Sequence, residues 1–260
     1  MNILCIGDIV GRPGRDAVAG LLPKLIAEHD LEFVIANAEN AAGGAGIIPK
    51  IADELFSYGC DVLTAGDHIW DKKDILDYLD QTPRLLRPAN FPVDTPGHGF
   101  FVTETKKGKK IGVINLLGRV FIRYNVLCPF ETMTKVLKEI YRQTRIVIVD
   151  FHAEATSEKI ALGHFADGKV SAVFGTHTHV QTADEKILPL GTGYLTDVGM
   201  TGPFDSVIGQ KKENIIERFL TTIPSKFEVA TEDVGLNGVV FTIDEKTGLT
   251  TKIIRIQRRV

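Results

Sequence analysis

Short apolar runs alternate with longer amphipathic segments through the first third of the chain. Each apolar run has the length and β-branched content of a buried strand, and each segment after it repeats apolar residues at helical spacing. The strand–helix pairs are Asn2–Gly7 with Ala17–Glu28, Phe33–Asn37 with Pro49–Tyr58, and Asp61–Ala65 with Lys73–Leu79. This alternation predicts an α/β fold in which right-handed crossovers connect neighbouring parallel strands.

The remaining sequence adds signals for antiparallel hairpins. Two pairs of strand patterns flank short turns that contain glycine, as expected for hairpins. The first pair is Gly99–Glu104 with Lys110–Asn115, and the second is Gly238–Ile243 with Thr250–Ile256. A helix is expected at Glu131–Arg142, with strands at Ile146–Asp150 and Val170–Phe174. We therefore predict mixed β-sheets flanked by helices, with a two-sheet sandwich favoured over a single mixed sheet. No repeat or linker divides the chain, so residues 1–260 are expected to form one domain.

Composition excludes several classes of protein. The chain is 44% hydrophobic with a net charge of −3, which fits neither a disordered protein nor a generally basic nucleic-acid binder. The cysteines Cys5, Cys60 and Cys128 are too few and too scattered for a disulfide framework or a cysteine-type zinc site. No signal-peptide pattern and no apolar stretch of roughly 18–20 residues is found, so a cytoplasmic protein without membrane contact is expected.

Polar side chains follow five of the predicted strands. In open α/β sheets, ligands bind outside the carboxyl ends of the strands. These positions therefore predict carboxylate, carboxamide and imidazole groups gathered at one edge. The five segments are Gly7-Asp8, Asn37-Ala38-Glu39-Asn40, Gly66-Asp67-His68, Phe151-His152 and Gly175-Thr176-His177-Thr178-His179.

Each of these polar residues, taken singly, also has a purely structural explanation that competes with a role in ligand binding. An aspartate after a strand, such as Asp8, usually caps a helix or closes a turn. Isolated histidines usually lie at the surface or pack locally. The pair His177 and His179 is harder to explain in this way. If that segment is extended, both rings point to the same side, about 7 Å apart, which suits two metal ions. Oxygen and imidazole ligands together are typical of Mn, Fe, Zn or Co sites.

The five segments resemble the metallophosphoesterase signature of calcineurin-like phosphatases, and more closely that of the bacterial YmdB-like phosphodiesterases. The resemblance spans residues 7 to 203 and consists of several stretches in order. These are GDIVGRPGR, NAENAAGGAGI, LTAGDHIWDKK, RPANFP, INLLGRVF, DFHAEATSEK, GTHTHVQTAD and TDVGMTGP.

The resemblance implies a calcineurin-like metallophosphoesterase fold with two divalent metal ions, usually iron or manganese, with zinc, cobalt or magnesium as alternatives. It implies hydrolysis of 2′,3′- or 3′,5′-cyclic nucleotides by attack of a metal-bridging hydroxide. His68 would protonate the leaving alkoxide or stabilise the transition-state phosphate. The implied metal ligands are Asp8, His179 and Asn40 at the first ion, Asp67, His152 and His177 at the second, and Glu39 bridging both.

The chain departs from the wider pattern at two positions. Asp8-Ile9-Val10 stands where the superfamily has Asp-x-His, an absence that the YmdB-like branch shares and that Asn40 compensates. Asp67 stands where Asn is usual. A further carboxylate should tighten metal binding, weaken Lewis acidity and raise the pKa of the bridging water, giving reduced activity or a shifted pH optimum. Asp67 therefore keeps a second hypothesis open, a regulatory nucleotide- or partner-binding protein with weak catalysis.

Three arginines are candidate phosphate ligands, because a guanidinium matches phosphate oxygens with two donors. Arg119 lies in a Gly-Arg loop, whereas Arg12 and Arg15 are equally explained as solvated charges near a helix start. The stretch Thr196–Gly202 is expected to line the cleft. The near-zero net charge favours a small phosphodiester over an extended nucleic acid as the partner, and a homo-oligomer is compatible with the sequence.

Overall fold

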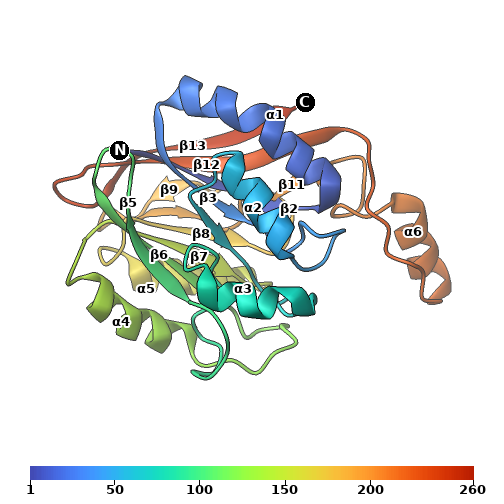
Figure 1. Ribbon diagram of the computed structural model, residues 1–260, viewed down its shortest axis with the longest axis horizontal. Helices are drawn as coiled ribbons and strands as arrows, with labels where there is room; N and C mark the ends of the chain where they lie inside the picture. Colours follow the sequence, from blue (N-terminus) through green and yellow to red (C-terminus); the bar gives the residue numbers. More distant parts are fainter.

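Two β-sheets lie face to face at the centre of the computed structural model, which describes residues 1–260 (Figure 1). One sheet has the strand order β2-β11-β12-β1-β3-β4, with β13 paired to β12. Its strands are β1 (Asn2–Ile6), β2 (Asp8–Ile9), β3 (Leu31–Asn37), β4 (Val62–Thr64), β11 (Met200–Pro203), β12 (Val234–Ile243) and β13 (Thr250–Arg259). β1, β3 and β4 run parallel, whereas β12 is antiparallel to both β1 and β13.

The second sheet has the order β5-β6-β7-β8-β10-β9. β6, β7, β8 and β10 run parallel, and β5 and β9 close the two edges in antiparallel pairing. Its strands are β5 (Phe100–Glu104), β6 (Lys110–Leu117), β7 (Val147–His152), β8 (Ala172–Thr176), β9 (Lys186–Ile187) and β10 (Gly193–Leu195). The predicted mixed sheets and both predicted hairpins are confirmed.

Helices cover the outer faces of this sandwich (Figure 1). Those of the first half pack on the first sheet, and α4 and α5 pack on the second. The helices are α1 (Gly11–His29), α2 (Pro49–Ser57), α3 (Leu76–Gln81), α4 (Pro129–Ile140), α5 (Thr156–Ala166) and α6 (Lys212–Thr221), with a 3-10 turn at Lys73–Ile75. α6 projects beyond both sheets, at the right of Figure 1. No helix is long and apolar enough to cross a lipid bilayer.

Alternation along β1 assigns its side chains to two separate cores. Successive residues of a strand point to opposite faces. Ile3 and Cys5 therefore enter the apolar layer between the sheets, whereas Leu4 and Ile6 enter the layer under α1 and α2. Because both faces of β1 are buried, the strand reads as a continuous apolar run, which is the pattern expected of a central strand.

Helix α1 begins at Gly11, well before the predicted start at Ala17. The first turns of α1 were not predicted because glycine, present at position 14, disfavours helices. Packing of the helix nevertheless requires glycine at this position. A Cβ at this position would lie 2.4 Å from the backbone oxygen of Thr201 on β11. Pro13 is tolerated because an N–H in the first turn has no partner within the helix. The extension moves the helix start against the edge of the sheet that carries Asp8.

Several short elements were not predicted, namely α5, α6, β2 and β9–β11. The pattern of α5 is obscured because its buried face includes Lys159 as well as Leu162 and Ala166. A charged residue at a core position breaks the apolar periodicity that identifies an amphipathic helix.

Candidate metal centre and active site

Five strands end at the same edge of the sandwich and deliver the polar segments expected from the sequence. β1, β3 and β4 belong to the first sheet, and β7 and β8 to the second. The side chains that follow them are withdrawn from solvent: Asp8 and His152 are fully buried and Glu39 is 1% exposed. Charged groups are seldom buried to this degree unless they are paired or coordinate a metal.

Four of these side chains form a tight cluster. One ligand atom from each of Glu39, Asp67, His152 and His177 lies within 4.8 Å of every other. His152 Nε2 is the common neighbour, at 3.0 Å from Glu39 Oε1 and 3.0 Å from His177 Nδ1. The Asp67 Oδ1 atom lies 3.5 Å from the same nitrogen. The cluster therefore joins two acidic side chains of the first sheet to two imidazoles of the second.

A second group of polar side chains lies on the other side of Glu39. His179 Nε2 is 3.8 Å from Asp8 Oδ1 and 3.3 Å from the carboxamide of Asn40. The Asn40 carboxamide in turn lies 3.4 Å from Glu39 Oε1. Glu39 thus contacts members of both groups, as a carboxylate shared by two ions would.

The donor set fits divalent cations. The atoms Asp8 Oδ1 and Asp67 Oδ1 are buried and have no hydrogen-bond partner. A buried carboxylate oxygen left unpaired is costly, and a cation satisfies it directly. Carboxylate oxygens and imidazole nitrogens are ligands that Mn, Fe and Zn accept.

Burial and neighbouring charges shift the pKa values of these side chains in different directions. Burial lowers the pKa of His177 to about 4, and the nearby His152 adds to this effect. His177 is therefore neutral near pH 7, as a metal ligand must be. Burial opposes ionisation of Glu39, but the adjacent His152 holds the pKa of Glu39 below its usual value. Burial raises the pKa of Asp8.

A buried network beneath the cluster orients His152. The Thr176 hydroxyl donates to Asp150 Oδ1 at 2.7 Å and lies 2.9 Å from His152 Nδ1. Because that hydroxyl proton is committed to Asp150, the contact assigns the imidazole proton to Nδ1, leaving Nε2 free to act as a ligand. Thr64 also donates to Asp150, at 2.5 Å. Burial raises the pKa of Asp150 to about 7.

The turn after β8 does not have the extended conformation assumed for His177 and His179, and that expectation is wrong. Their φ angles are 101° and 63°. Non-glycine residues adopt this region only where surrounding contacts compensate the strain. The backbone N–H of His177 donates to Asp8 Oδ2 at 3.1 Å, and that of Thr178 donates to Asp197 Oδ2 at 3.2 Å. The turn sends the two rings to different groups of ligands.

The expected role of the stretch Thr196–Gly202 is also wrong. The segment is buried and supports the histidine turn from behind, whereas the cavity wall lies elsewhere. Its Asp197 forms a buried ion pair with Lys159 of α5, with Nζ 2.6 Å from Oδ2. The same Nζ donates to the backbone oxygen of Thr176 at 2.8 Å.

Glycine at position 66 is required by close packing against the cluster. A Cβ on Gly66 would lie 2.3 Å from His152 Nε2 and 2.5 Å from Glu39 Oε2. Any other residue would displace these side chains, because real Cβ atoms do not approach so closely. The glycine of the Gly66-Asp67-His68 segment therefore lets β4 end directly beside β7.

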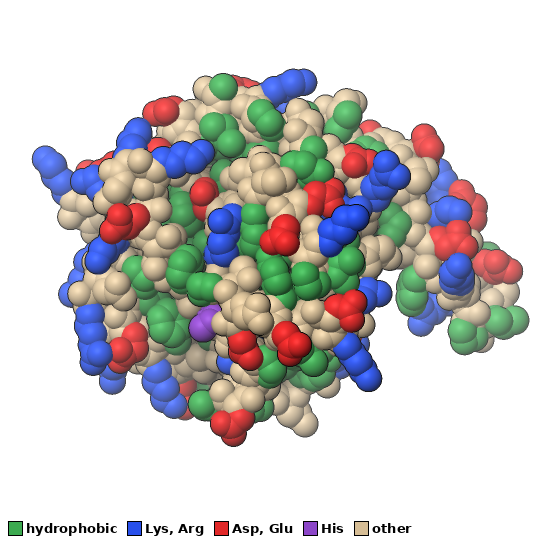
Figure 2. Space-filling view, in the orientation of Figure 1, with side chains coloured by type: hydrophobic (Ala, Val, Ile, Leu, Met, Phe, Trp, Pro, Cys, Tyr) green, Lys and Arg blue, Asp and Glu red, His purple; other side chains and the backbone are tan.

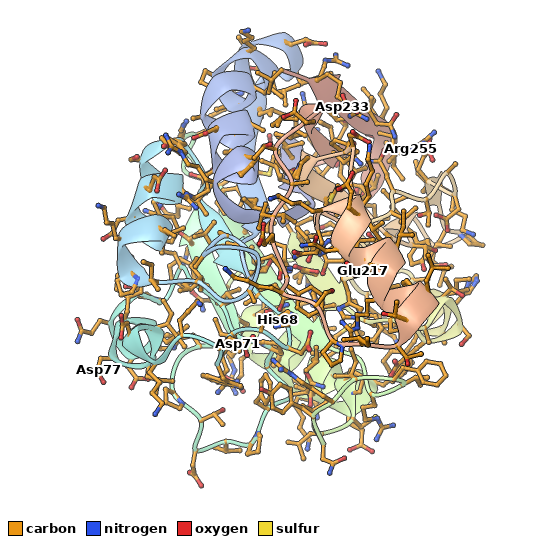
Figure 3. The ribbon with its side chains drawn as sticks, turned by 90° about the vertical axis from the view of Figure 1, so that its right-hand side faces the viewer. His68, Asp71, Asp77, Glu217, Asp233 and Arg255 are labelled. Atoms are coloured by element: carbon orange, nitrogen blue, oxygen red, sulfur yellow. The ribbon has the colours of Figure 1, made fainter.

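His68 lies at the mouth of the site rather than within the cluster. Its backbone N–H donates to Glu39 Oε2 at 3.0 Å, and its Nδ1 lies 2.7 Å from Asp71 Oδ2. Figure 3 shows His68 and Asp71 next to each other, both coming from the segment after β4. The Asp71 contact fixes the ring and leaves Nε2 without a protein partner. His68 lines a cavity of about 440 Å³ together with Glu39 and His177.

Arg123 contacts two acidic side chains at the edge of the site, and no motif in the sequence pointed to it. Its Nε lies 3.3 Å from Asp67 Oδ2, and its Nη2 lies 2.8 Å from Asp71 Oδ1. The same Nη2 donates to the backbone oxygen of Asp67 at 2.5 Å. The one available signal was indirect: an additional carboxylate at position 67 requires a nearby cation.

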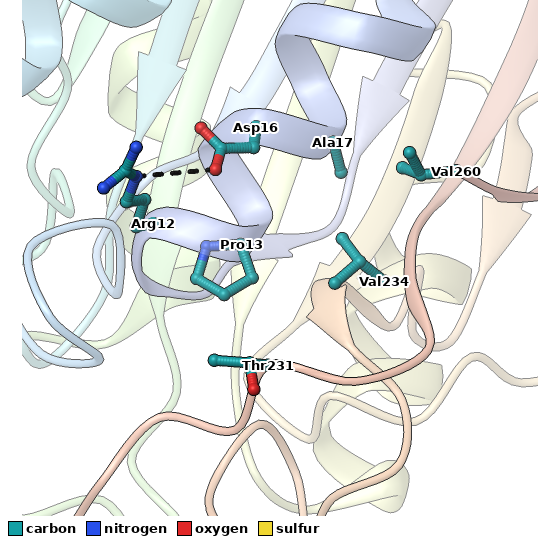
Figure 4. Close-up of a pocket in the computed structure, with 7 residues that line it drawn as sticks. All are labelled: Arg12, Pro13, Asp16, Ala17, Thr231, Val234 and Val260. Atoms are coloured by element: carbon teal, nitrogen blue, oxygen red, sulfur yellow. Dashed lines mark ion pairs between the residues drawn. The ribbon is translucent and has the colours of Figure 1, made fainter.

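The structure places the three candidate arginines apart from the cavity wall. Arg12 is 82% exposed and pairs with Asp16, as Figure 4 shows. Arg15 pairs with Glu54 and donates to the backbone oxygen of Ala41, so it supports the loop after β3. Arg119 is exposed, and its backbone N–H donates to a carboxylate of α5.

A family model for YmdB-like proteins matches residues 4–256. The chain belongs to the YmdB-like family. The match extends over almost the whole chain, including the hairpin formed by β12 and β13, and so reaches well beyond the stretches that carry the sequence resemblance.

Among similar proteins, the 2′,3′-cyclic-nucleotide 2′-phosphodiesterase of Bacillus subtilis is 51% identical, over 98% of this chain and 96% of that protein. The crystal structure of a novel phosphatase from Mycoplasma pneumoniae has a TM-score of 0.93 at 37% identity, covering 100% of this chain and 93% of that one. A hypothetical protein from Thermus thermophilus has a TM-score of 0.92 at 39% identity, covering 100% of this chain and 99% of that one. The metallophosphoesterase fold expected from the sequence is confirmed.

Charged side chains of both signs are mixed on one face of this YmdB-like protein. Lys and Arg side chains alternate with Asp and Glu over the face seen in Figure 2, without a basic stripe. This face agrees with the near-neutral composition.

Proposed function

We propose that this chain is a phosphodiesterase that hydrolyses nucleoside 2′,3′-cyclic phosphates at a two-metal centre. The observation that carries the proposal is the buried set of carboxylates and imidazoles with two unpartnered carboxylate oxygens, open to a cavity that also holds His68. The similarity to the B. subtilis 2′,3′-cyclic-nucleotide 2′-phosphodiesterase supports the choice of substrate. Hydrolysis of 3′,5′-cyclic nucleotides is part of the same proposal.

We assign the metal ligands by the two groups around Glu39. Asp8, Asn40 and His179 would hold one ion, and Asp67, His152 and His177 the other, with Glu39 shared. Iron or manganese suits these ligands, and zinc, cobalt or magnesium are alternatives. When bound, the ions would polarise the phosphoryl oxygens and lower the pKa of a water molecule for in-line attack.

The remaining chemistry belongs to the protein side chains. Hydrolysis adds the hydroxyl of water to phosphorus and breaks the bond from phosphorus to O2′, so the leaving O2′ must gain a proton. His68 is assigned this proton transfer, because Asp71 holds its Nδ1 and its Nε2 is free in the cavity. The product is a nucleoside 3′-phosphate. Arg123, and more remotely Arg119 and Arg12, are proposed as cations that attract the phosphate.

A second candidate function, a regulatory nucleotide-binding protein with weak catalysis, rests on the additional carboxylate of Asp67. The position of Arg123 makes this second function less favoured, because the guanidinium lies 3.3 Å from Asp67 and offsets its negative charge. Turnover distinguishes the two functions. A phosphodiesterase hydrolyses many substrate molecules per protein molecule, whereas a sensor binds the nucleotide without hydrolysing it.

The decisive experiment combines metal analysis with a substrate panel. Purified protein is stripped with chelator, reloaded with Mn²⁺ or Fe²⁺, and assayed on 2′,3′-cyclic AMP, 3′,5′-cyclic AMP and adenosine 5′-monophosphate. We expect about two ions per chain and conversion of 2′,3′-cyclic AMP to 3′-AMP. Nucleotide binding without product would favour the sensor.

The role of His68 is tested with His68→Ala in the same assay. We expect turnover to fall by roughly 10²- to 10⁴-fold, the usual contribution of a general acid, with metal content retained. Asp71→Asn should give a smaller loss, because it frees the ring without removing it. Full turnover by His68→Ala would refute the assignment.

A further inference from the structure

One wall of the cavity comes from a distant part of the chain. Ile208, Gln210 and Phe227 line the same cavity of about 440 Å³ as the candidate ligands Glu39 and His179. Ile208 and Gln210 precede α6, and Phe227 follows it, so these residues form the base of the projecting arm (Figure 1). The proposed chemistry makes no use of this wall.

Direct contacts hold the base of the arm against the metal-ligand groups. His179 Nδ1 lies 2.9 Å from the backbone oxygen of Ile208 and can donate to it. Gln210 forms a β-bridge with Val229, and the backbone N–H of Lys211 donates to the oxygen of Glu228 at 2.9 Å. The segment that carries Phe227 is therefore paired with the segment that contacts a candidate metal ligand.

Phe227 presents an aromatic surface to this cavity. The residue is 60% exposed, so its ring is accessible to a molecule bound in the cavity. The Arg218 guanidinium of α6 lies 5.2 Å from its ring centroid. This contact orients the ring from the arm side. The arrangement resembles the aromatic platforms on which single nucleobases stack.

Gln210 supplies an independent observation in the same wall. Its Oε1 atom is buried and has no hydrogen-bond partner. A buried amide oxygen without a partner is unfavourable, and it marks a place where a ligand donor can bind. The neighbouring wall at Gly43, Gly44 and Ala45 carries little or no side chain, which leaves room for a flat group.

We propose that Phe227 and Gln210 bind the nucleobase of the cyclic nucleotide, Phe227 by stacking and Gln210 by hydrogen bonding. The inference rests on the proposed function, since the cyclic phosphate at the metal centre brings the base into the same cavity. The cavity volume falls within the range of small-molecule sites, about 300–1,000 Å³. Stacking accepts any base, so purines should bind more tightly than pyrimidines through their larger surface.

The test compares 2′,3′-cyclic AMP with methyl ribofuranoside 2′,3′-cyclic phosphate, which lacks a base. For Phe227→Ala we expect the ratio of kcat/KM between these substrates to fall by about 5- to 100-fold, mainly through KM, as loss of one stacked base predicts. Phe227→Tyr should restore the preference. Gln210→Ala should lower the same ratio by a smaller factor, about 3- to 10-fold.

Phe219→Ala is the matched control, since Phe219 lies on the same arm, is 80% exposed and is not part of the cavity wall. An unchanged ratio in Phe227→Ala, or equal losses on both substrates, would overturn the base subsite. Failure of the unmodified enzyme on both substrates would instead overturn the proposed function. The base subsite would then be tested by comparing the affinities of 3′-AMP and ribose 3-phosphate, both for the unmodified protein and for Phe227→Ala.

Discussion

At the scale of single residues, Asp67 introduces a carboxylate where the family resemblance implies a neutral asparagine. With Asp8 and Glu39 it places three acidic side chains in a buried space. Burial opposes ionisation of Asp67, but the nearby His152 holds the pKa of Asp67 well below its usual range. Arg123 contacts Asp67 from the solvent side. The added charge is therefore partly neutralised within the protein, before any metal binds.

Asp67→Asn tests what this charge does. We expect metal affinity to fall by about tenfold, because one anionic ligand becomes neutral, and turnover per bound metal pair to rise as Lewis acidity recovers. Metal titration by calorimetry and kcat at saturating Mn²⁺ measure the two effects separately. Asp77→Asn, an exposed change on α3, is the control. Unchanged rate together with unchanged metal content would rule out this account of Asp67.

At the scale of elements, α5 and the turn after β8 act as one unit. Lys159 of α5 is 1% exposed, and its charge is met by Asp197 and by the oxygen of Thr176. Asp197 also accepts from the backbone N–H groups of Thr178 and Gly199, at 3.2 and 2.8 Å. This ion pair thereby holds the strained turn that carries His177 and His179. Lys159 is a positioning residue, because it acts through the turn.

Lys159→Met should affect stability and metal binding together. Leaving Asp197 buried without its partner costs about 3–5 kcal/mol of unfolding free energy. Loss of support for the ligand turn should weaken metal affinity by about 10- to 100-fold. Urea unfolding measures the first effect and metal titration of the folded variant the second.

Lys24→Met, on the exposed face of α1, is the matched control and should change neither quantity. The double change Lys159→Met with Asp197→Leu removes both charges and should recover part of the stability without recovering metal affinity. If Lys159→Met retains normal metal affinity, the ion pair supports the fold but does not position the turn.

At the scale of the whole molecule, the candidate metal centre connects the two sheets. Glu39 and Asp67 follow strands of the first sheet, whereas His152 and His177 come from the second. Apolar contacts fill most of the layer between the sheets, such as those of Phe33 on one side and Phe174 on the other, and Thr64 donates across it to Asp150. A bound ion would therefore restrain the sheets against separation at the edge where this apolar layer ends.

Metal loading should accordingly raise the melting temperature. At a free metal concentration of 100 times Kd, one site contributes about 2.7 kcal/mol. For a chain of this size each kcal/mol shifts Tm by about 2–4 °C, so we expect an increase of roughly 5–10 °C per site. Calorimetry of chelator-treated protein with and without Mn²⁺ measures it. The Glu39→Gln variant should show a smaller response, and an unchanged Tm in the unmodified protein would argue against a metal centre.

Local patterns in the sequence distinguished helices from strands, and they determined both hairpins and the set of polar residues that follow the strands. These depend on hydrophobic periodicity and turn residues, which are properties of neighbouring positions. Periodicity failed where tertiary contacts overrode it. Gly14 lies inside α1 because of the backbone of β11, and Lys159 lies in the core because of Asp197.

Only the tertiary structure decided how the candidate site is assembled. It brought Arg123 to Asp67, turned His177 and His179 apart, and placed Phe227 beside the ligands. The contacts of Arg123 and Phe227 join residues that are distant in sequence, and the turn at His177 and His179 depends on the distant Asp8 and Asp197. None of these leaves a pattern in its own segment. The sequence by itself determined which chemical groups the strand ends carry. Packing of the two sheets determined which of these groups meet, because side-chain partners across a core are selected by geometry rather than by sequence separation.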